Sequence, residues 1–149
     1  MFHILVVDDD KNTRQLIKAV LETENYIVIG ATDGEDALKV LDRSHIDLVI
    51  LDVMMPKMDG YEFTEILRRV QNELPILMVS AKQLPADRNK GFIVGTDDFM
   101  TKPFDEEELL LRVKALLRRA KIVNEHRIII GEVILDYDSL TVKRKNTCQ

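Results

Sequence analysis

Residues 49–60 read VILDVMMPKMDG, a run of strand-forming aliphatic side chains that ends on a carboxylate, Asp52. The three residues before Asp52 are typical of a buried β-strand, and the proline and glycine that follow are typical of a turn. A charge at the end of a buried strand either begins the turn or is held there for chemistry. The rest of the sequence distinguishes these two interpretations.

Five aliphatic runs alternate with helical patterns along the chain. The predicted strands are Ile4–Val7, Tyr26–Ile29, Ile46–Leu51, Leu74–Val79 and Asp98–Met100. The first, third and fourth runs are apolar at nearly every position, as in parallel strands that are covered on both faces. Residues 84–94 show the weakest helical pattern, and residues 105–119 show the clearest. Regular strand–helix alternation predicts an α/β fold, a doubly wound five-stranded parallel sheet with right-handed crossovers.

The pattern changes near residue 121. Residues 122–127 resemble a short linker, and residues 128–149 predict three short antiparallel strands. Strands of this size bury no core alone. The sequence therefore predicts one domain over residues 1–121, a linker over residues 122–127 and the first piece of a second domain over residues 128–149.

The composition excludes several classes of protein. A hydrophobic fraction of 46% provides a core without disulfides, and the single cysteine, Cys148, has no internal partner, which favours a reducing compartment. The apolar run at the N-terminus is too short for a signal peptide or a membrane span. We therefore expect a cytoplasmic protein with no membrane partner. The net charge of -5 gives no general attraction to nucleic acid.

Polar side chains follow four of the five predicted strands. They are Asp8, Asp9 and Asp10 after the first strand, Asp52 after the third, Ser80 after the fourth and Lys102 after the fifth. Ligands of open α/β sheets bind beyond the carboxyl ends of the strands. If the strand order is 2-1-3-4-5, strands 1 and 3 are neighbours, and Asp8, Asp9 and Asp52 share one crevice.

Clustered carboxylates repel one another unless a cation lies between them. An oxygen-only cluster suits Mg²⁺, which accepts one or two carboxylates together with phosphate oxygens. With the Lys102 ammonium and the Ser80 hydroxyl, such a site suits phosphoryl transfer to an aspartate. Each residue alone is more often a turn or loop residue. The joint arrangement favours chemistry.

Four motifs carry a resemblance to a known family. VVDDD at residues 6–10, LDVMMPKMDG around Asp52, VSAK at residues 79–82 and GTDDFMTKPF at residues 95–104 resemble the receiver domain of two-component response regulators. The likeness covers about residues 1–120. It implies that Asp52 accepts a phosphoryl group from a sensor histidine kinase, and that the domain itself promotes Mg²⁺-dependent phosphotransfer and slow autodephosphorylation.

The resemblance also implies the ligands of the metal. Asp9, Asp52 and the backbone carbonyl of Met54 would bind Mg²⁺ directly, and Asp8 would act through water. A bulky side chain at Met54, beside the path of attacking water, and another at Lys82 predict slow hydrolysis of the phosphoryl group.

The remaining positions of the family pattern concern the switch. Ser80 and Lys102 would contact the phosphoryl oxygens, and the Lys102–Pro103 peptide bond would be cis. Ser80 and Phe99 would form the switch pair, in which the hydroxyl moves to the phosphoryl group and the ring turns inward behind it. Without a family context, Phe99 is an ordinary core aromatic.

The last helix and the strand-rich tail resemble the OmpR/PhoB subfamily, whose second domain is a winged helix. Residues 128–149 would begin that domain, and promoter DNA would be bound only by the part missing from this chain. Phosphorylated receivers of the subfamily form homodimers through helix 4, strand 5 and helix 5. The matching ion pairs here are Arg88 with Glu108 and Asp98 with Arg112, although a solvated charged face is the simpler interpretation of these residues.

Three other functions fit the sequence less well. A flavodoxin-like FMN protein needs hydroxyl and glycine donors after strand 1, where this chain has aspartates. A haloacid-dehalogenase-type phosphatase places its nucleophile after strand 1, and here it follows strand 3. A pseudo-receiver, which binds partners without phosphorylation, remains the alternative, although none of Asp9, Asp52 and Lys102 is replaced.

Overall fold

The computed structural model describes residues 1–81 and 84–121. The predicted linker at residues 122–127, the predicted strands at residues 128–149, Cys148 and Lys82 lie outside the described residues. The first compact unit, Met1–Leu116, carries every residue of the candidate site.

Within the described residues, five strands alternate with five helices. The elements are β1 (His3–Val7), α1 (Lys11–Glu22), β2 (Ile27–Ala31), α2 (Gly34–Arg43), β3 (Leu48–Asp52), α3 (Gly60–Val70), β4 (Ile76–Ser80), α4 (Pro85–Val94), β5 (Asp98–Thr101) and a helix over residues 106–121. The strands pair in parallel in the order β2-β1-β3-β4-β5. The predicted doubly wound parallel sheet is confirmed.

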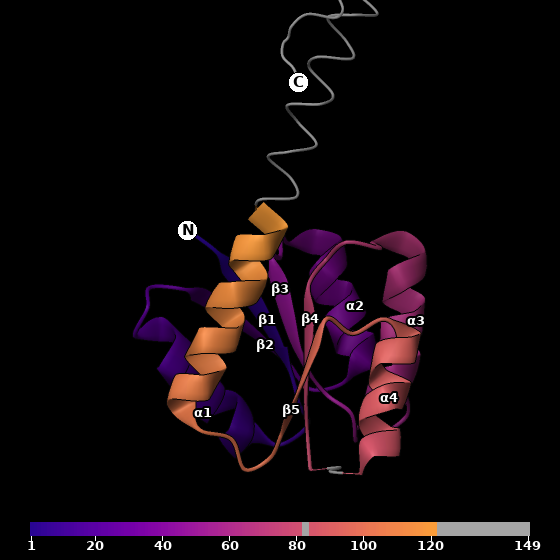
Figure 1. Cartoon of the computed structure of the whole chain (residues 1–149). Coiled ribbons are helices and arrows are strands. Elements are labelled where there is room, and N and C mark those ends of the chain that lie inside the picture. The colour runs from indigo at the N-terminus through magenta and orange to yellow at the C-terminus, as the bar shows by residue number, and fades with distance from the viewer. Residues whose placement is uncertain (82–83, 122–149) are drawn as a thin grey trace, which may run out of the picture. The chain divides into compact units, whose positions relative to one another are not determined.

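Helices cover both faces of the sheet. In Figure 1, α1 and the first turns of the helix that begins at residue 106 lie on one side, and α2, α3 and α4 lie on the other. β3 and β4 are buried at every position because neither face reaches water. This central position of β3 and β4 fixes the backbone that presents the site.

Three predicted strands begin and end too early, and one of them is Tyr26–Ile29, which corresponds to the strand Ile27–Ala31. The runs Ile46–Leu51 and Leu74–Val79 correspond to the strands Leu48–Asp52 and Ile76–Ser80. Ile46 and Leu74 are buried without belonging to the strands. An apolar run therefore predicts which residues are buried better than it predicts which residues pair in a strand. As a consequence, Asp52 and Ser80 are the last residues of β3 and β4 and not the first loop residues after them.

The weak helical pattern near residue 90 corresponds to an unusual helix. In α4 only Gly91 is buried, whereas Phe92 and Ile93 are exposed. Gly95, with φ of 118°, ends the helix in the left-handed conformation that glycine adopts without strain. α4 therefore packs closely through a residue without a side chain and presents the apolar side chains of Phe92 and Ile93 to solvent.

Candidate functional site

Three carboxylates meet at the C-terminal edge of the sheet. Asp52 ends β3, and Asp8 and Asp9 follow β1. One carboxylate oxygen from each residue lies within 4.8 Å of the others, with Asp8 and Asp52 buried and Asp9 exposed. The pairing of β1 with β3 brings these residues together. The edge is the lower end of the sheet in Figure 1.

The third aspartate of the run has a different role. Asp10 is the N-cap of α1, where its side chain accepts hydrogen bonds from the Asn12 backbone N–H at 3.2 Å and from the Thr13 hydroxyl at 2.7 Å. It therefore holds the start of the helix. Arg14, which the sequence reasoning missed, donates to the backbone carbonyl of Asp8 at 2.6 Å. The pattern that could have indicated this contact is a basic residue about one helical turn after the three aspartates.

Lys102 links the carboxylates to β5. Its Nζ lies 2.8 Å from Asp8 Oδ2 and 3.6 Å from Asp52 Oδ1. Its backbone N–H donates to the carbonyl of Ser80 at 2.7 Å, which ties the loop after β5 to the end of β4. The Lys102–Pro103 peptide bond is cis. The Lys102 ammonium is thus shared by the buried carboxylates of Asp8 and Asp52.

This arrangement shifts the ionisation of both partners. Burial, together with repulsion from Asp8 and Asp9, raises the pKa of Asp52 from 3.8 to about 6, against the opposing effects of Lys102 and the Met54 N–H. Burial alone would lower the pKa of Lys102, but its hydrogen bond to Asp8 and its attraction to Asp52 outweigh burial and raise it. At neutral pH the site holds an ionised but poorly solvated Asp52 carboxylate.

The predicted switch residues lie on β4 and β5. Ser80 is fully buried at the end of β4, opposite Thr101 in the strand register. The Phe99 ring is buried and turned inward, and Arg88 lies 5.7 Å from its centroid. Arg88 also donates to the Phe99 carbonyl at 3.1 Å. Arg88, near the start of α4, therefore contacts both the ring and the backbone of Phe99 on β5.

The loop after Asp52 returns close to the strand at Gly60. The Gly60 N–H donates to the Val53 carbonyl at 2.8 Å. A Cβ on Gly60 would lie 2.6 Å from the Asp52 carbonyl oxygen and 2.8 Å from the Val53 Cα. The Met54 side chain, in contrast, is 58% exposed. The loop thus requires glycine at position 60 but makes little use of the Met54 side chain.

Gly60→Ala is expected to lower the free energy of unfolding by about 1–3 kcal/mol, because the new methyl group overlaps two backbone atoms that cannot rotate away. The matched control is Gly30→Ala, where the nearest atom, Arg14 Cδ, lies at an ordinary 3.6 Å. Urea unfolding of both variants measures the difference. Equal stabilities of the two variants would contradict the close approach at Gly60.

The donor set fits a hard divalent cation. Carboxylate oxygens are the ligands that Mg²⁺ prefers, and ligands of one octahedral Mg²⁺ lie roughly 3–4 Å apart. One oxygen each of Asp8, Asp9 and Asp52 lies within 4.8 Å of the others, so small side-chain rotations would bring them to that spacing. A cation there would also relieve the repulsion that raises the pKa of Asp52. Within the described residues, this is the one group of three such donors whose ligand atoms all lie within 4.8 Å of one another.

Residues 4–114 match the response regulator receiver domain family. The chain belongs to this family. It is 38% identical over 147 residues to the heme response regulator HssR of Staphylococcus epidermidis, covering 97% of this chain and 65% of HssR. It is 44% identical over 140 residues to PhoP of Bacillus subtilis, an alkaline phosphatase synthesis transcriptional regulatory protein, covering 87% of this chain and 58% of PhoP. The chain therefore spans less than two thirds of the length of these relatives.

Solved receiver domains share the fold. The receiver domain of the Francisella response regulator 1452 has a TM-score of 0.76 and 35% identity, covering 80% of this chain and 98% of that one. The BeF3-activated DrrB receiver domain has a TM-score of 0.74 and 36% identity, covering 79% and 98%. Both likenesses extend over nearly the whole of the compared chain, as expected for a complete receiver domain.

The residues predicted for the dimer face are paired within this receiver domain. Arg112 donates to both oxygens of Asp98 at 2.8 and 2.9 Å and to Glu108 at 3.0 Å. Arg88 lies by Phe99 instead of Glu108. None of the helices in the described ranges is both long and apolar enough to cross a membrane.

Proposed function

We propose that this receiver domain accepts a phosphoryl group on Asp52 from a sensor histidine kinase. The observation that carries the proposal is the position of Asp52, a buried carboxylate at the end of β3 beside Asp8, Asp9 and Lys102. In the transfer, an Asp52 oxygen attacks phosphorus and the bond from phosphorus to the kinase imidazole breaks. A pKa of about 6 leaves the carboxylate ionised at neutral pH, which the attack requires.

Mg²⁺ would be held by Asp9, Asp52 and the Met54 carbonyl, with Asp8 acting through water, and would supply positive charge to the phosphoryl oxygens. Lys102 adds a second positive charge. To contact the phosphoryl oxygens, its ammonium gives up part of its contact with Asp8. Asp52 does the bond-making, while its neighbours on β1 and β5 balance charge. These roles rest on the family resemblance and on the distances within the site.

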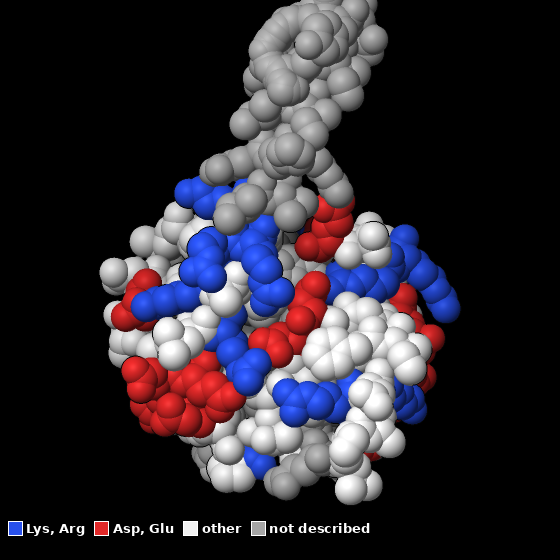
Figure 2. Space-filling view, viewed as in Figure 1, with Lys and Arg blue, Asp and Glu red and all other residues white. Residues whose placement is uncertain are grey.

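We further propose that phosphorylation acts through Ser80 and Phe99 on the face formed by α4, β5 and the helix at residues 106–121. Figure 2 shows this face, with white surface over α4 beside interleaved acidic and basic side chains. Its exposed large apolar side chains are Leu84, Phe92, Ile93 and Leu111. In a homodimer, apolar contact would supply the affinity and the Asp98, Arg112 and Glu108 charges the register.

The output of the full-length protein would be transcriptional. PhoP carries the name of a transcriptional regulatory protein, and the tail from residue 128 resembles the start of a winged helix. Promoter DNA would be bound by the recognition helix of such a domain, because a winged helix reads the major groove with that helix.

Incubation with Mg²⁺ and acetyl phosphate is expected to add one phosphoryl group to the protein, and Asp52→Asn is expected to remove this uptake. Intact-mass spectrometry measures the modification, and light scattering measures dimer formation after addition of beryllofluoride. Asp42→Asn, on the exposed side of α2, is the matched control and should behave as the wild type. Full uptake by Asp52→Asn would overturn the assignment of Asp52, and absence of uptake by the wild type would favour a phosphorylation-independent interaction module.

The phosphoryl group is expected to persist for minutes or longer. The Met54 side chain projects into solvent beside the acceptor and narrows the path of attacking water without offering a base. Loss of the phosphoryl group after removal of acetyl phosphate can be followed by mass spectrometry. Met54→Ala should shorten the half-life, and a wild-type half-life of seconds would contradict this prediction.

A further inference from the structure

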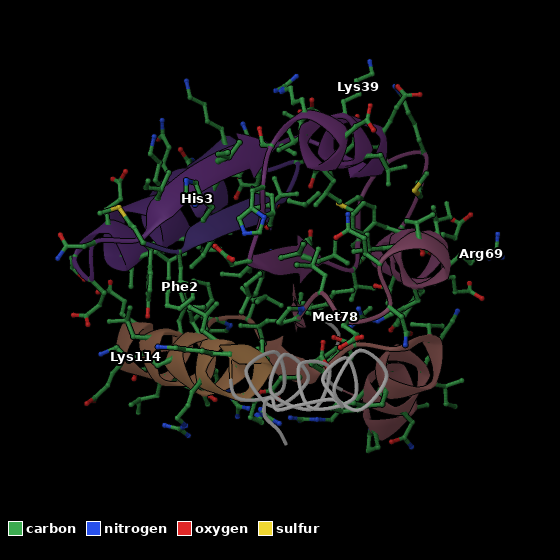
Figure 3. All side chains as sticks on the ribbon, turned by 90° about the horizontal axis from the view of Figure 1, so that it is seen from above. Phe2, His3, Lys39, Arg69, Met78 and Lys114 are labelled. Atoms are coloured by element: carbon green, nitrogen blue, oxygen red, sulfur yellow. The ribbon has the colours of Figure 1, made fainter. Side chains whose placement is uncertain are left out.

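A second group of polar side chains lies at the opposite edge of the sheet. His3 begins β1, and His45 and Asp47 lie in the connection between α2 and β3. Figure 3 looks onto this edge from above and labels His3. The group is separated from the carboxylates of the phosphoacceptor site by the length of β1, and the proposed phosphotransfer does not use it.

Asp47 is fixed to β1, is hydrogen-bonded to the His45 ring and lies near the His3 ring. The His3 backbone N–H donates to Asp47 Oδ2 at 2.8 Å, and the Asp47 backbone N–H donates to the His3 carbonyl at 2.8 Å. The ring of His45 donates from Nε2 to Asp47 Oδ1 at 2.8 Å. The two rings meet edge to face with centroids 6.3 Å apart. One carboxylate thus lies between two imidazoles.

The Nδ1 atom of His3 has no hydrogen-bond partner. Of the buried side-chain nitrogen and oxygen atoms in the described residues, it is the one without a hydrogen-bond partner. A buried polar atom without a partner costs free energy unless a ligand binds it. Asp47 Oδ2 lies 3.9 Å away, beyond hydrogen-bonding distance. A bridging water needs about 2.8 Å to each atom and would be held at an acute angle. Two donors on a tetrahedral transition-metal ion, with bonds of about 2.0–2.2 Å, lie roughly 3.3–3.6 Å apart, so a small approach of these two atoms would let them share one ion.

We propose that His3, His45 and Asp47 form a binding site for a divalent transition-metal cation of the Zn²⁺ class. Two imidazole nitrogens and one carboxylate oxygen are donors that Zn²⁺ accepts, whereas Mg²⁺ prefers oxygen alone. The chemistry of the donors therefore separates this site from the three-aspartate site at the other edge. Water would complete the tetrahedron on the solvent side.

Binding requires mainly a movement of His45, with a small adjustment of the His3 and Asp47 side chains. The three donor atoms do not all lie within 4.8 Å of one another, but the His45 side chain is 77% exposed and can rotate toward His3 at little cost. Its Nε2 proton then passes to Nδ1, so the neutral ring offers a lone pair to the metal without net loss of a proton. His3 and Asp47 are already held by the backbone pairing of β1 with the connection before β3.

Isothermal titration with Zn²⁺ in excess Mg²⁺ tests the proposal. The experiment uses the complete chain in a Cys148→Ser background, so that no thiol competes. One equivalent should bind, and His3→Gln and His45→Gln should each weaken binding by about tenfold or more, because loss of a direct ligand costs at least as much as loss of a supporting one. His126→Gln, at the third histidine of the sequence, is the control.

Amide NMR shifts locate the ion independently of its affinity. Zn²⁺ should shift the His3, His45 and Asp47 signals and leave those of Asp8 and Asp52 in place, and it should raise the melting temperature by mass action. Asp52→Asn should bind Zn²⁺ as the wild type does. Unchanged binding by His3→Gln and His45→Gln, absence of binding, or loss of binding in Asp52→Asn would each overturn the proposal. None of these outcomes depends on whether Asp52 accepts a phosphoryl group.

Discussion

Asp52→Asn is expected to make the metal-free protein more stable than the wild type by up to about 3 kcal/mol at pH 7. The Asp52 carboxylate is buried beside Asp8, which raises its pKa from 3.8 to about 6. Each pKa unit corresponds to about 1.4 kcal/mol of preference for the neutral form. An amide of the same shape avoids that cost.

The gain should depend on pH in a defined direction. A raised pKa means that the folded wild type binds more protons than the unfolded chain between pH 4 and about pH 6. Its free energy of unfolding therefore falls as the pH rises through this window, and the full cost is present above it. Asp52→Asn lacks this dependence, so the two curves should converge near pH 4 and separate toward pH 7.

Urea unfolding in EDTA at several pH values measures the difference. Mg²⁺ should stabilise the wild type and have a much smaller effect on Asp52→Asn, because binding to the folded state alone adds stability. Asp42→Asn, an exposed carboxylate on α2, should stay within about 0.5 kcal/mol of the wild type. A variant less stable than the wild type at pH 7 would show that the carboxylate is well solvated or well paired after all.

Lys102→Met is expected to destabilise the protein by about 2–3 kcal/mol at pH 7. Removal of the ammonium leaves Asp8, at 2.8 Å, and Asp52, at 3.6 Å, without their shared cation. Breaking a fully buried ion pair costs about 3–5 kcal/mol, and Lys102 keeps 24% of its side chain in water, which reduces the figure. Methionine fills most of the lysine volume, so the effect measures charge more than packing.

The cost of Lys102→Met should shrink as the pH falls below about 6, because protonation of Asp52 removes one of the two unpaired charges. The double variant Asp52→Asn/Lys102→Met tests the same point at neutral pH. We expect the Lys102 substitution to cost at least about 1 kcal/mol less in the Asn background, a coupling typical of residues in contact. Additive effects of the two substitutions would contradict a shared electrostatic site.

Much of this arrangement could be predicted from the sequence because it depends on local patterns. Alternating apolar runs and helical spacing predicted the parallel sheet, whereas its strand order entered as an assumption that the structure confirms. Carboxylates after runs 1 and 3 predicted a cluster, since parallel strands end at one edge. The strand boundaries were less accurate: Ile46 and Leu74 are buried outside the strands, and an apolar run carries no information on where the hydrogen-bond ladder begins.

Contacts between distant parts of the chain could not be predicted in this way. The sequence does not show that Asp10 caps α1 while Asp8 and Asp9 face the site, because three successive aspartates differ only in backbone direction. Nor does it show the hydrogen bond from Arg14 to the Asp8 carbonyl. That bond depends on how α1 packs against the loop after β1.

The sequence by itself determined the fold and the types of residue gathered at the end of the strands, because periodicity and strand termini are local properties. Only the tertiary structure decided that Lys102 is shared by Asp8 and Asp52 and that Asp52 is poorly solvated. The same holds for His3, which lies 44 residues from Asp47 in the chain and 2.8 Å from it in space. Distance and burial arise from packing the whole sheet, and they place the aspartate at the end of β3 in a poorly solvated cluster of carboxylates beside a shared lysine.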